Sequence, residues 1–209
     1  MEINNIFCVG RNYRKHAEEL GNTIPKEPII FSKPTHSIVY AQGQQISYPL
    51  EDGEIHYEIE VVLRIKDQPK GNNFTVNDSI SHLGLGIDLT KRDLQTKLKE
   101  RGYPWLLAKG FKNAAILTDF WDFPGEEICK GVDFSLTKNG HIVQKGNISQ
   151  LIFPFEKLLR YIHQHFGLKK GDIVFTGTPE GVGPISHGDF FEMWWGEERK
   201  GEFKVKTYE

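Results

Sequence analysis

The segment from His56 to Ile65 constrains the fold most, because its side chains alternate as they do on an extended strand. One face of that strand would carry the apolar side chains of Tyr57, Ile59, Val61 and Leu63. The other face would carry Glu58 and Glu60, two residues apart, followed by Val62. An arbitrary Glu-x-Glu pair most often faces solvent, yet this strand continues almost wholly apolar. Since two adjacent carboxylates repel unless a positive charge lies between them, the pair indicates a shared cation.

Further strands and a few helices are predicted from apolar runs and their flanking turn residues. The predicted strands are Ile6–Gly10, Pro28–Lys33, Leu83–Leu89, Phe134–Lys138, His141–Lys145, Ile173–Thr176, Phe190–Trp195 and Glu202–Tyr208, with a hairpin turn at Asn139-Gly140. The predicted helices are Tyr13–Leu20, Thr90–Glu100 and Phe155–Phe166, with N-caps at Asn12 and Thr90 and stops at Gly21, Gly102 and Gly167. Because strands dominate and do not alternate regularly with helices, we expect one β-dominated α+β domain over residues 1–209.

Composition and charge exclude several classes of protein. Lys plus Arg number 26 and Asp plus Glu 28, so the formal charge of -2 argues against a nucleic-acid partner. No apolar run approaches the roughly 20 residues of a membrane span, and no segment has the pattern of a signal peptide. The two cysteines, Cys8 and Cys129, provide neither a disulfide framework nor a zinc site, and Cys8 in its apolar run is expected to be buried. We therefore expect a cytoplasmic protein.

Asp88 is a third carboxylate of interest, because it ends an apolar strand just before a predicted helix. Asp at such a place often caps the helix or faces its dipole, but Thr90 already offers a cap. Three carboxylates with open positions filled by water suit a hard ion such as Mg²⁺ or Mn²⁺. Spacing alone does not show that Asp88 meets Glu58 and Glu60 in space, so the shared metal site is a hypothesis.

Other features would suit chemistry on a substrate beside such an ion. His16 and Glu19 share one helix face, where a carboxylate fixes the tautomer of an imidazole and raises its basicity. Lys109 follows the apolar run Pro104–Ala108, where a partly desolvated ammonium would stabilise an enolate or a carboxylate. A surface ion pair and an ordinary lysine are the simpler interpretations. The turn-rich loop Gly177–Pro184 is either an anion-binding nest or a structural turn, and it lacks the ending of a nucleotide-binding P-loop.

Taken together, the motifs resemble those of the fumarylacetoacetate hydrolase family and occur in the same order. They are Gly10-Arg11-Asn12-Tyr13-x-x-His16-x-x-Glu19, Phe31-x-Lys33-Pro34, Glu58-x-Glu60, Asp88-x-Thr90-x-Arg92-Asp93-x-Gln95, Pro104-Trp105-x-Leu107-Ala108-Lys109-x-Phe111 and Thr176-Gly177-Thr178-Pro179-x-Gly181-Val182-Gly183-Pro184. The chain looks closest to the short single-domain members. The resemblance implies a mixed β-roll fold and a homodimer.

The resemblance also implies roles for individual residues. Mg²⁺ or Mn²⁺ would be held by the residues matching the family's ligands, which are Glu58, Glu60 and Asp88. Lys109 would be catalytic, and His16 with Glu19 would activate a water molecule. The positions that match the family's substrate pocket are Arg11, Tyr13, Lys33, Gln95 and Thr178. A lid is expected around Gly21 to Glu27, whereas His36 and the Met193-Trp194-Trp195 segment match no feature of the family.

The first functional hypothesis is hydrolysis of a 3-acylpyruvate, a 2,4-dioxo acid. The metal would chelate the 2-oxo and carboxylate oxygens, water activated by His16 would attack the distal carbonyl, and pyruvate enolate would leave. Decarboxylation of oxaloacetate reaches the same enolate without activated water, and isomerisation of an unsaturated 2-oxo diacid is a third alternative. A non-catalytic binding protein would be expected to lack a metal ligand or Lys109, and this sequence keeps them all.

Overall fold

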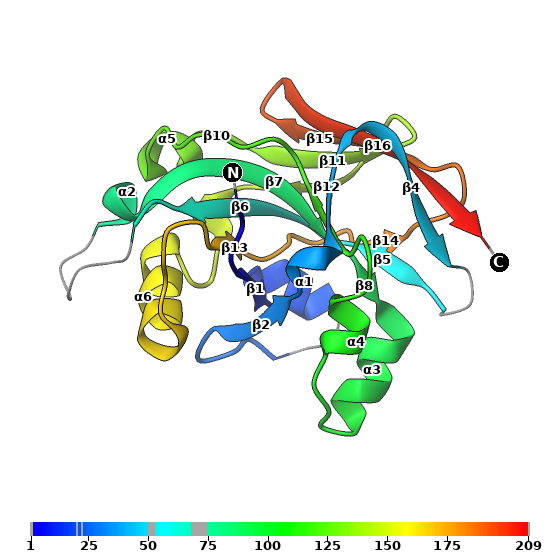
Figure 1. Cartoon of the computed structure of the whole chain (residues 1–209), viewed down its shortest axis with the longest axis horizontal. Helices are drawn as coiled ribbons and strands as arrows, with labels where there is room; N and C mark the ends of the chain where they lie inside the picture. The colour runs from blue at the N-terminus through cyan, green and yellow to red at the C-terminus, as the bar shows by residue number, and fades with distance from the viewer. Residues whose placement is uncertain (1, 20, 22, 50–52, 68–74, 209) are drawn as a thin grey trace.

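The structure, a computed structural model, describes residues 2–19, 21, 23–49, 53–67 and 75–208, and within these ranges the strands form three sheets (Figure 1). The large sheet runs in the order β2 (Ile29–Lys33), β1 (Ile6–Gly10), β13 (Ile173–Phe175), β6 (Ile59–Ile65), β7 (Ile80–Asp88), β9 (Ala115–Leu117) and β3 (Ile38–Tyr40), with β10 (Trp121–Asp122) paired to β7. The second sheet runs in the order β12 (His141–Gly146), β11 (Phe134–Lys138), β15 (Phe190–Trp195), β16 (Glu198–Tyr208) and β4 (Gln42–Pro49). The smallest contains β14 (Gly183–Pro184), β5 (Ile55–Tyr57) and β8 (Thr90–Lys91).

The helices are short, and the longest, α6, has 12 residues. They are α1 (Arg14–Glu19), α2 (Val76–Ser79), α3 (Arg92–Glu100), α4 (Leu106–Lys109), α5 (Glu126–Lys130) and α6 (Phe155–Phe166), with 3₁₀ turns at Thr35–Ser37 and Ile148–Gln150. Figure 1 shows α3 and α4 together at one end and α6 at the other, with the long strands β6 and β7 arching between them. The predicted β-dominated α+β class is confirmed.

The predicted strand from His56 to Ile65 is wrong in one respect, because it is interrupted at Glu58. The part before the break, β5, pairs with β14 and β8, whereas the part after it, β6, pairs with β13 and β7. The chain therefore leaves one sheet and enters another at Glu58. All seven residues of β6 are buried, so neither of its faces meets solvent.

Two predicted helix starts are also wrong. Thr90 does not cap α3 but lies in β8, where it pairs with His56, and α3 begins at Arg92 without a side-chain cap. Asn12 does not cap α1, because its amide spans two distant backbone segments: Nδ2 donates to the carbonyls of Phe153 and Thr176, and Oδ1 accepts from the N–H of Phe153. In both cases a tertiary contact competes with the local cap and prevails.

Other local predictions are confirmed. Asn139 and Gly140 have φ values of 54° and 82° and connect β11 to β12, as a type I′ hairpin requires. Helix α6 ends at Gly167, whose φ is 75°. Cys8 is buried, as predicted, and Cys129 is buried too; both are free thiols. No helix in the described ranges is long and apolar enough to cross a membrane.

Candidate active site

Three buried carboxylates from different elements meet at one point. Glu58 lies at the break between β5 and β6, Glu60 is the second residue of β6, and Asp88 ends β7. Because β6 and β7 are antiparallel neighbours with Ile59 opposite Ile87, Asp88 lies beside Glu58, and its N–H donates to the Glu58 carbonyl at 2.9 Å. One oxygen from each of the three side chains lies within 4.8 Å of the others. The predicted convergence of these carboxylates is therefore observed.

Two buried lysines and an arginine neutralise part of this charge. Lys109 Nζ lies 2.9 Å from Glu58 and 2.7 Å from Asp88, and Lys33 Nζ lies 2.7 Å from Asp88. Arg92 donates to the second oxygen of Glu58. Burial raises the pKa of Glu58, but the charges of Lys109 and Arg92 outweigh burial and hold this pKa well below its usual range. Burial likewise lowers the pKa of Lys109, yet Asp88 and Glu58 outweigh it and raise this pKa above its ordinary value.

Glu60 differs from the other two carboxylates. Its Oε2 accepts from the Gly177 N–H at 2.7 Å, and no ion pair to Glu60 occurs among the described residues. Burial and the nearby charge of Asp88 raise its pKa well above the ordinary 4.5. A metal cation beside Glu60 would lower this pKa again, because a positive charge favours the ionised carboxylate. The donor set, three buried carboxylate oxygens with one acid lacking a charge partner, fits a hard divalent cation.

The predicted His16–Glu19 pair is present on α1. His16 is buried, and its Nδ1 lies 3.6 Å from Glu19 Oε2 with no hydrogen-bond partner among the described residues. The Glu19 carboxylate also accepts from the Gly181 N–H at 3.2 Å. Burial lowers the pKa of His16 below the ordinary 6.5, and the opposing charge of Glu58 does not restore it. The imidazole is therefore neutral near pH 7, which is the form that accepts a proton.

A pH dependence follows from this lowered pKa. If His16 is the general base, the acid limb of kcat/KM is expected at a pH below 6.5, the ordinary pKa of imidazole. In the unfolded chain His16 takes up a proton below about pH 6.5, whereas the folded protein resists it. Its contribution to stability is thus complete above this pH and decreases as the pH falls. The pH profile of kcat/KM checks the position of the acid limb. His36→Ala, which removes an exposed histidine, is the control.

The loop from Gly177 to Pro184 binds carboxylates with its amides, but they are the chain's own. The Gly177 N–H holds Glu60, and the Gly181 N–H holds Glu19. Both glycines have positive φ, 106° and 94°. A Cβ at Gly181 would lie 2.2 Å from the Val143 carbonyl oxygen, so only glycine fits this close approach. The loop therefore contacts both Glu60, one of the three buried carboxylates, and Glu19 of the His16–Glu19 pair.

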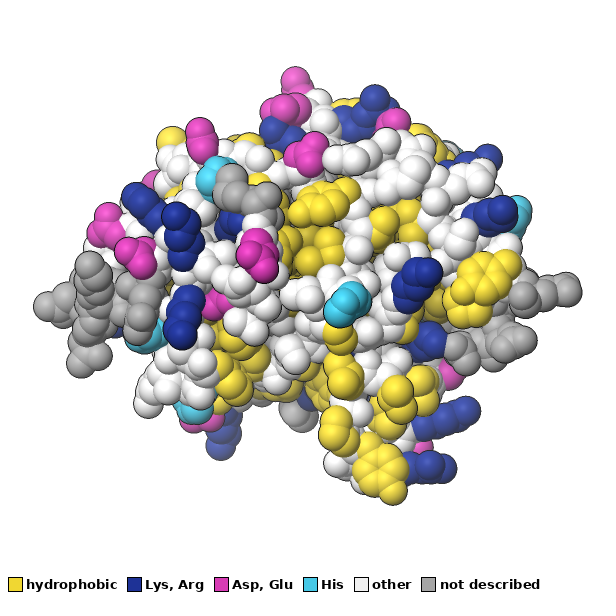
Figure 2. All heavy atoms as spheres, in the orientation of Figure 1, with side chains coloured by type: hydrophobic (Ala, Val, Ile, Leu, Met, Phe, Trp, Pro, Cys, Tyr) yellow, Lys and Arg dark blue, Asp and Glu magenta, His cyan; other side chains and the backbone are white. Residues whose placement is uncertain are grey.

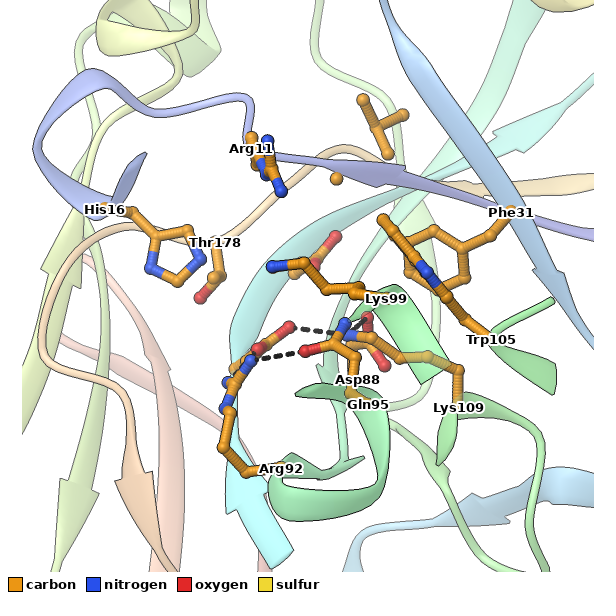
Figure 3. Close-up of a pocket in the computed structure, with 14 residues that line it drawn as sticks. Arg11, His16, Phe31, Asp88, Arg92, Gln95, Lys99, Trp105, Lys109 and Thr178 are labelled. Atoms are coloured by element: carbon orange, nitrogen blue, oxygen red, sulfur yellow. Dashed lines mark hydrogen bonds and ion pairs between the residues drawn. The ribbon is translucent and has the colours of Figure 1, made fainter. Parts of the chain in front are cut away.

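These groups open into one pocket, and Figure 3 shows His16, Arg11 and Thr178 facing Arg92, Gln95 and Lys109 across it. Three of the residues predicted to contact substrate line it, namely Arg11, Gln95 and Thr178. The other two do not. The Tyr13 hydroxyl donates to the Asn147 carbonyl at 3.3 Å, and Lys33 Nζ donates to the carbonyls of Leu89 and Lys109. The chemical roles of all these residues stay predictions.

Sequence reasoning missed two pocket residues with a clear helical signal. Arg92 and Lys99 lie seven residues apart on α3 and Gln95 lies between them, so all three share one helix face. Arg92 donates to Gln95 Oε1 at 2.8 Å as well as to Glu58. Burial lowers the pKa of Lys99, and so do the neighbouring charges of Arg11 and Arg92. The pocket therefore concentrates positive charge opposite His16. The predicted lid includes residue 22, which lies outside the described residues, and it stays a prediction.

The chain is similar to known proteins over most of its length. Residues 5–205 match the family model described as Fumarylacetoacetate (FAA) hydrolase C-terminal. Oxaloacetate tautomerase YcgM of Escherichia coli is 36% identical over 191 residues, which are 90% of this chain and 86% of that protein. The mitochondrial oxaloacetate decarboxylase of Dictyostelium discoideum is 39% identical, covering 88% of this chain and 84% of its own length. The crystal structure of fumarylpyruvate hydrolase from Pseudomonas aeruginosa in complex with Mn²⁺ and pyruvate has a TM-score of 0.88 at 31% identity, covering 99% of this chain and 91% of that one.

Proposed function

This chain belongs to the fumarylacetoacetate hydrolase family, and we propose that it is a divalent-metal-dependent enzyme acting on a small 2-oxo dicarboxylate, with oxaloacetate as the expected substrate. One observation supports this most. The buried carboxylate triad adjoins a pocket that also carries the cations Arg11, Arg92 and Lys99. Arg92 is paired with Glu58, whereas the charges of Arg11 and Arg92 both lower the pKa of Lys99, so this side of the pocket is electropositive and complements the distal carboxylate of a doubly charged anion. Relatives named for oxaloacetate chemistry, at 36% and 39% identity, support the same substrate.

The expected metal is Mg²⁺ or Mn²⁺, held by Glu58, Glu60 and Asp88. All-oxygen ligands with room for water and substrate oxygens suit these two ions, and the Pseudomonas aeruginosa relative contains Mn²⁺ with pyruvate. When bound, such an ion supplies Lewis-acid polarisation of the 2-oxo group.

In the proposed reaction, side chains of this protein bind the substrate, move the proton and stabilise the developing charge. Thr178 donates a hydrogen bond to the carboxylate next to the 2-oxo group, and Arg11 with Lys99 binds the distal carboxylate. Neutral His16 takes a proton from the carbon beside the 2-oxo group, whose electron pair moves to the 2-oxo oxygen and gives the enolate. Lys109 stabilises the negative charge that develops there. Return of the proton to carbon or to oxygen gives the keto or the enol form.

Hydrolysis of a 3-acylpyruvate is the second candidate, and a different observation favours it. His16 Nδ1 lies 3.6 Å from Glu19, so a small shift on substrate binding would form the hydrogen bond that makes the imidazole a base for a water molecule. In that reaction the water attacks the distal carbonyl, the carbon–carbon bond breaks, and its electron pair stays on the pyruvate enolate. Decarboxylation of oxaloacetate gives the same enolate with loss of CO₂ and needs no activated water.

Turnover of oxaloacetate and acetylpyruvate separates these reactions. The ultraviolet absorbance of the enol and the release of pyruvate are followed with Mg²⁺, with Mn²⁺ and with chelator. We expect chelator-sensitive acceleration of keto–enol exchange or pyruvate release from oxaloacetate, with a higher kcat/KM than for acetylpyruvate. A higher kcat/KM for acetylpyruvate would favour the hydrolase. Acceleration of neither substrate would contradict both candidates.

Lys99 provides a test of substrate charge. Lys99→Met is expected to raise KM for oxaloacetate about tenfold, since a hydrogen bond to a charged group contributes roughly 1.5 kcal/mol. KM for acetylpyruvate, which has one carboxylate, should change less than about twofold by the same reasoning. Lys97→Met is the matched control, because Lys97 lies on α3 but not among the residues that line the pocket. Equal effects on the two substrates would argue against a distal carboxylate at Lys99.

A homodimer stays a prediction, and the surface near the pocket supports it. Tyr103, Leu106 and Leu107 are 56%, 51% and 69% exposed. Figure 2 shows hydrophobic side chains gathered at the surface over α3 and α4. Exposed apolar patches of this kind mark contact sites between proteins. Sedimentation equilibrium of the wild type and of Leu107→Lys would measure whether this surface joins two copies.

A further inference from the structure

Gln144 is a buried polar residue for which the proposed chemistry has no role. It lies on β12, is 2% exposed, and its side chain ends between the start of β6 and the loop after β13. Its Oε1 accepts from the Ile59 N–H at 2.8 Å. Its Nε2 donates to the Pro179 carbonyl and to Thr178 Oγ1, both at 2.9 Å. The Gln144 side chain thus connects the backbone at Ile59, between Glu58 and Glu60, with Thr178, which lines the pocket.

The direction of each of these hydrogen bonds is fixed by chemistry. A backbone N–H can only donate, so the atom facing Ile59 must be the amide oxygen. A carbonyl can only accept, so the atom facing Pro179 must be the amide nitrogen. The second proton of that nitrogen points at Thr178, whose hydroxyl oxygen must then accept it. The amide of Gln144 has no alternative orientation that satisfies both Ile59 and Pro179.

This direction determines what Thr178 offers to the pocket. A hydroxyl has one proton and two acceptor positions, and Gln144 occupies an acceptor position. Among the described residues, none accepts the proton of Thr178 Oγ1 within hydrogen-bond distance. Thr178 is 3% exposed and lines the pocket beside His16 (Figure 3). Its proton is therefore available to an acceptor in the pocket, such as a carboxylate oxygen.

We infer that Gln144 is a positioning residue, which holds the Thr178 hydroxyl as a hydrogen-bond donor to the substrate carboxylate. The inference rests on the proposed function, because it takes the ligand to be a 2-oxo acid. Preorganisation is the physical gain: a hydroxyl already turned toward the ligand loses less orientational freedom on binding. Gln144 itself does not touch the substrate, so its effect passes through Thr178.

A double-mutant cycle tests this with pyruvate as the probe. Its dissociation constant is measured by calorimetry at saturating Mg²⁺, so that changes in metal affinity do not enter. Gln144→Met removes the donor without adding charge and is expected to weaken pyruvate binding about fivefold, the effect of roughly one neutral hydrogen bond. Thr178→Val is expected to weaken it about tenfold, because this bond is to a charged group. The double variant should bind no more weakly than Thr178→Val alone, since Gln144 then has no hydroxyl to orient.

Several outcomes decide the inference. Multiplied effects in the double variant, or unchanged binding by Gln144→Met, would overturn it. Thr178→Ser keeps the hydroxyl and should bind pyruvate within about twofold of wild type. Should Gln144→Met not fold, Gln144→Leu, which also removes the donor without adding charge, goes through the same cycle with the same expectation. Wild-type protein that binds pyruvate but turns over neither oxaloacetate nor acetylpyruvate would contradict the proposed reaction, while the cycle would still decide the role of Gln144. Failure of wild type to bind pyruvate would overturn both.

Discussion

Glu60→Gln is expected to abolish metal-dependent turnover while the metal-free protein stays folded. The variant loses one of three anionic ligands, and metal catalysis of this kind contributes several kcal/mol, so activity should fall by roughly 10³-fold or more. Calorimetric titration with Mg²⁺ and Mn²⁺ should show the matching loss of affinity. Glu192→Gln, a partly buried glutamate on β15 that is not among the residues lining the pocket, is the control and should retain both activity and metal. Unchanged metal affinity in Glu60→Gln would remove Glu60 from the ligand set.

The metal-free stability of this variant distinguishes a ligand from a structural acid. Burial and the charge of Asp88 raise the pKa of Glu60, so the folded state holds a proton that the unfolded chain releases at lower pH. Ionisation of Glu60 therefore lowers stability as the pH rises above about 4.5, its ordinary pKa. A neutral amide avoids this cost and can still accept from the Gly177 N–H. Urea unfolding in the presence of chelator at pH 7 should give Glu60→Gln a free energy of unfolding equal to or above that of wild type.

The carboxylate pair was predictable because strand geometry repeats every two residues. The period of two placed Glu58 and Glu60 on one side of the chain, and the apolar run before Asp88 predicted the end of a strand, but the three carboxylates meet only because β6 pairs with β7. The break at Glu58 was not predictable, because it arises where the chain changes sheets, and local sequence carries little information about sheet partners. The caps at Asn12 and Thr90 failed for a related reason. Both residues make tertiary contacts that no local pattern reveals.

The residues that sequence reasoning missed have side chains that act across the fold. Gln144 lies on a well-predicted hairpin, but its partners Ile59 and Thr178 are 85 and 34 residues away. Lys99 had the correct helical spacing from Arg92, yet the helix face that lines the pocket is defined only by the packing of α3 near α4. Periodicity assigns a face to a side chain, whereas tertiary structure decides what that face meets.

Lys33→Met is expected to cause the largest loss of stability among these changes. The Lys33 side chain is fully buried, lies 2.7 Å from Asp88 and donates to the carbonyls of Leu89 and Lys109. Removal of one member of a buried ion pair costs about 3–5 kcal/mol when the other charge is left uncompensated. Lys109 still lies 2.7 Å from Asp88, so we expect a loss at the lower end of this range. Methionine has a similar length and fills the space, so the loss reports charge and hydrogen bonds rather than a cavity. The free energy of unfolding in urea, measured with chelator, checks this value.

Lys145→Met is the matched control, because it removes a lysine at nearly the same ion-pair distance but in solvent. Lys145 Nζ lies 2.9 Å from Asp133, and the two side chains are 60% and 48% exposed. An exposed pair of this kind contributes about 0–1 kcal/mol, so the two variants should differ by several kcal/mol. Added Mg²⁺ should restore part of the loss in Lys33→Met, since a cation among the carboxylates compensates Asp88 and stabilises the folded state. Equal stability of the two variants would mean that Lys33 does not hold Asp88 in place.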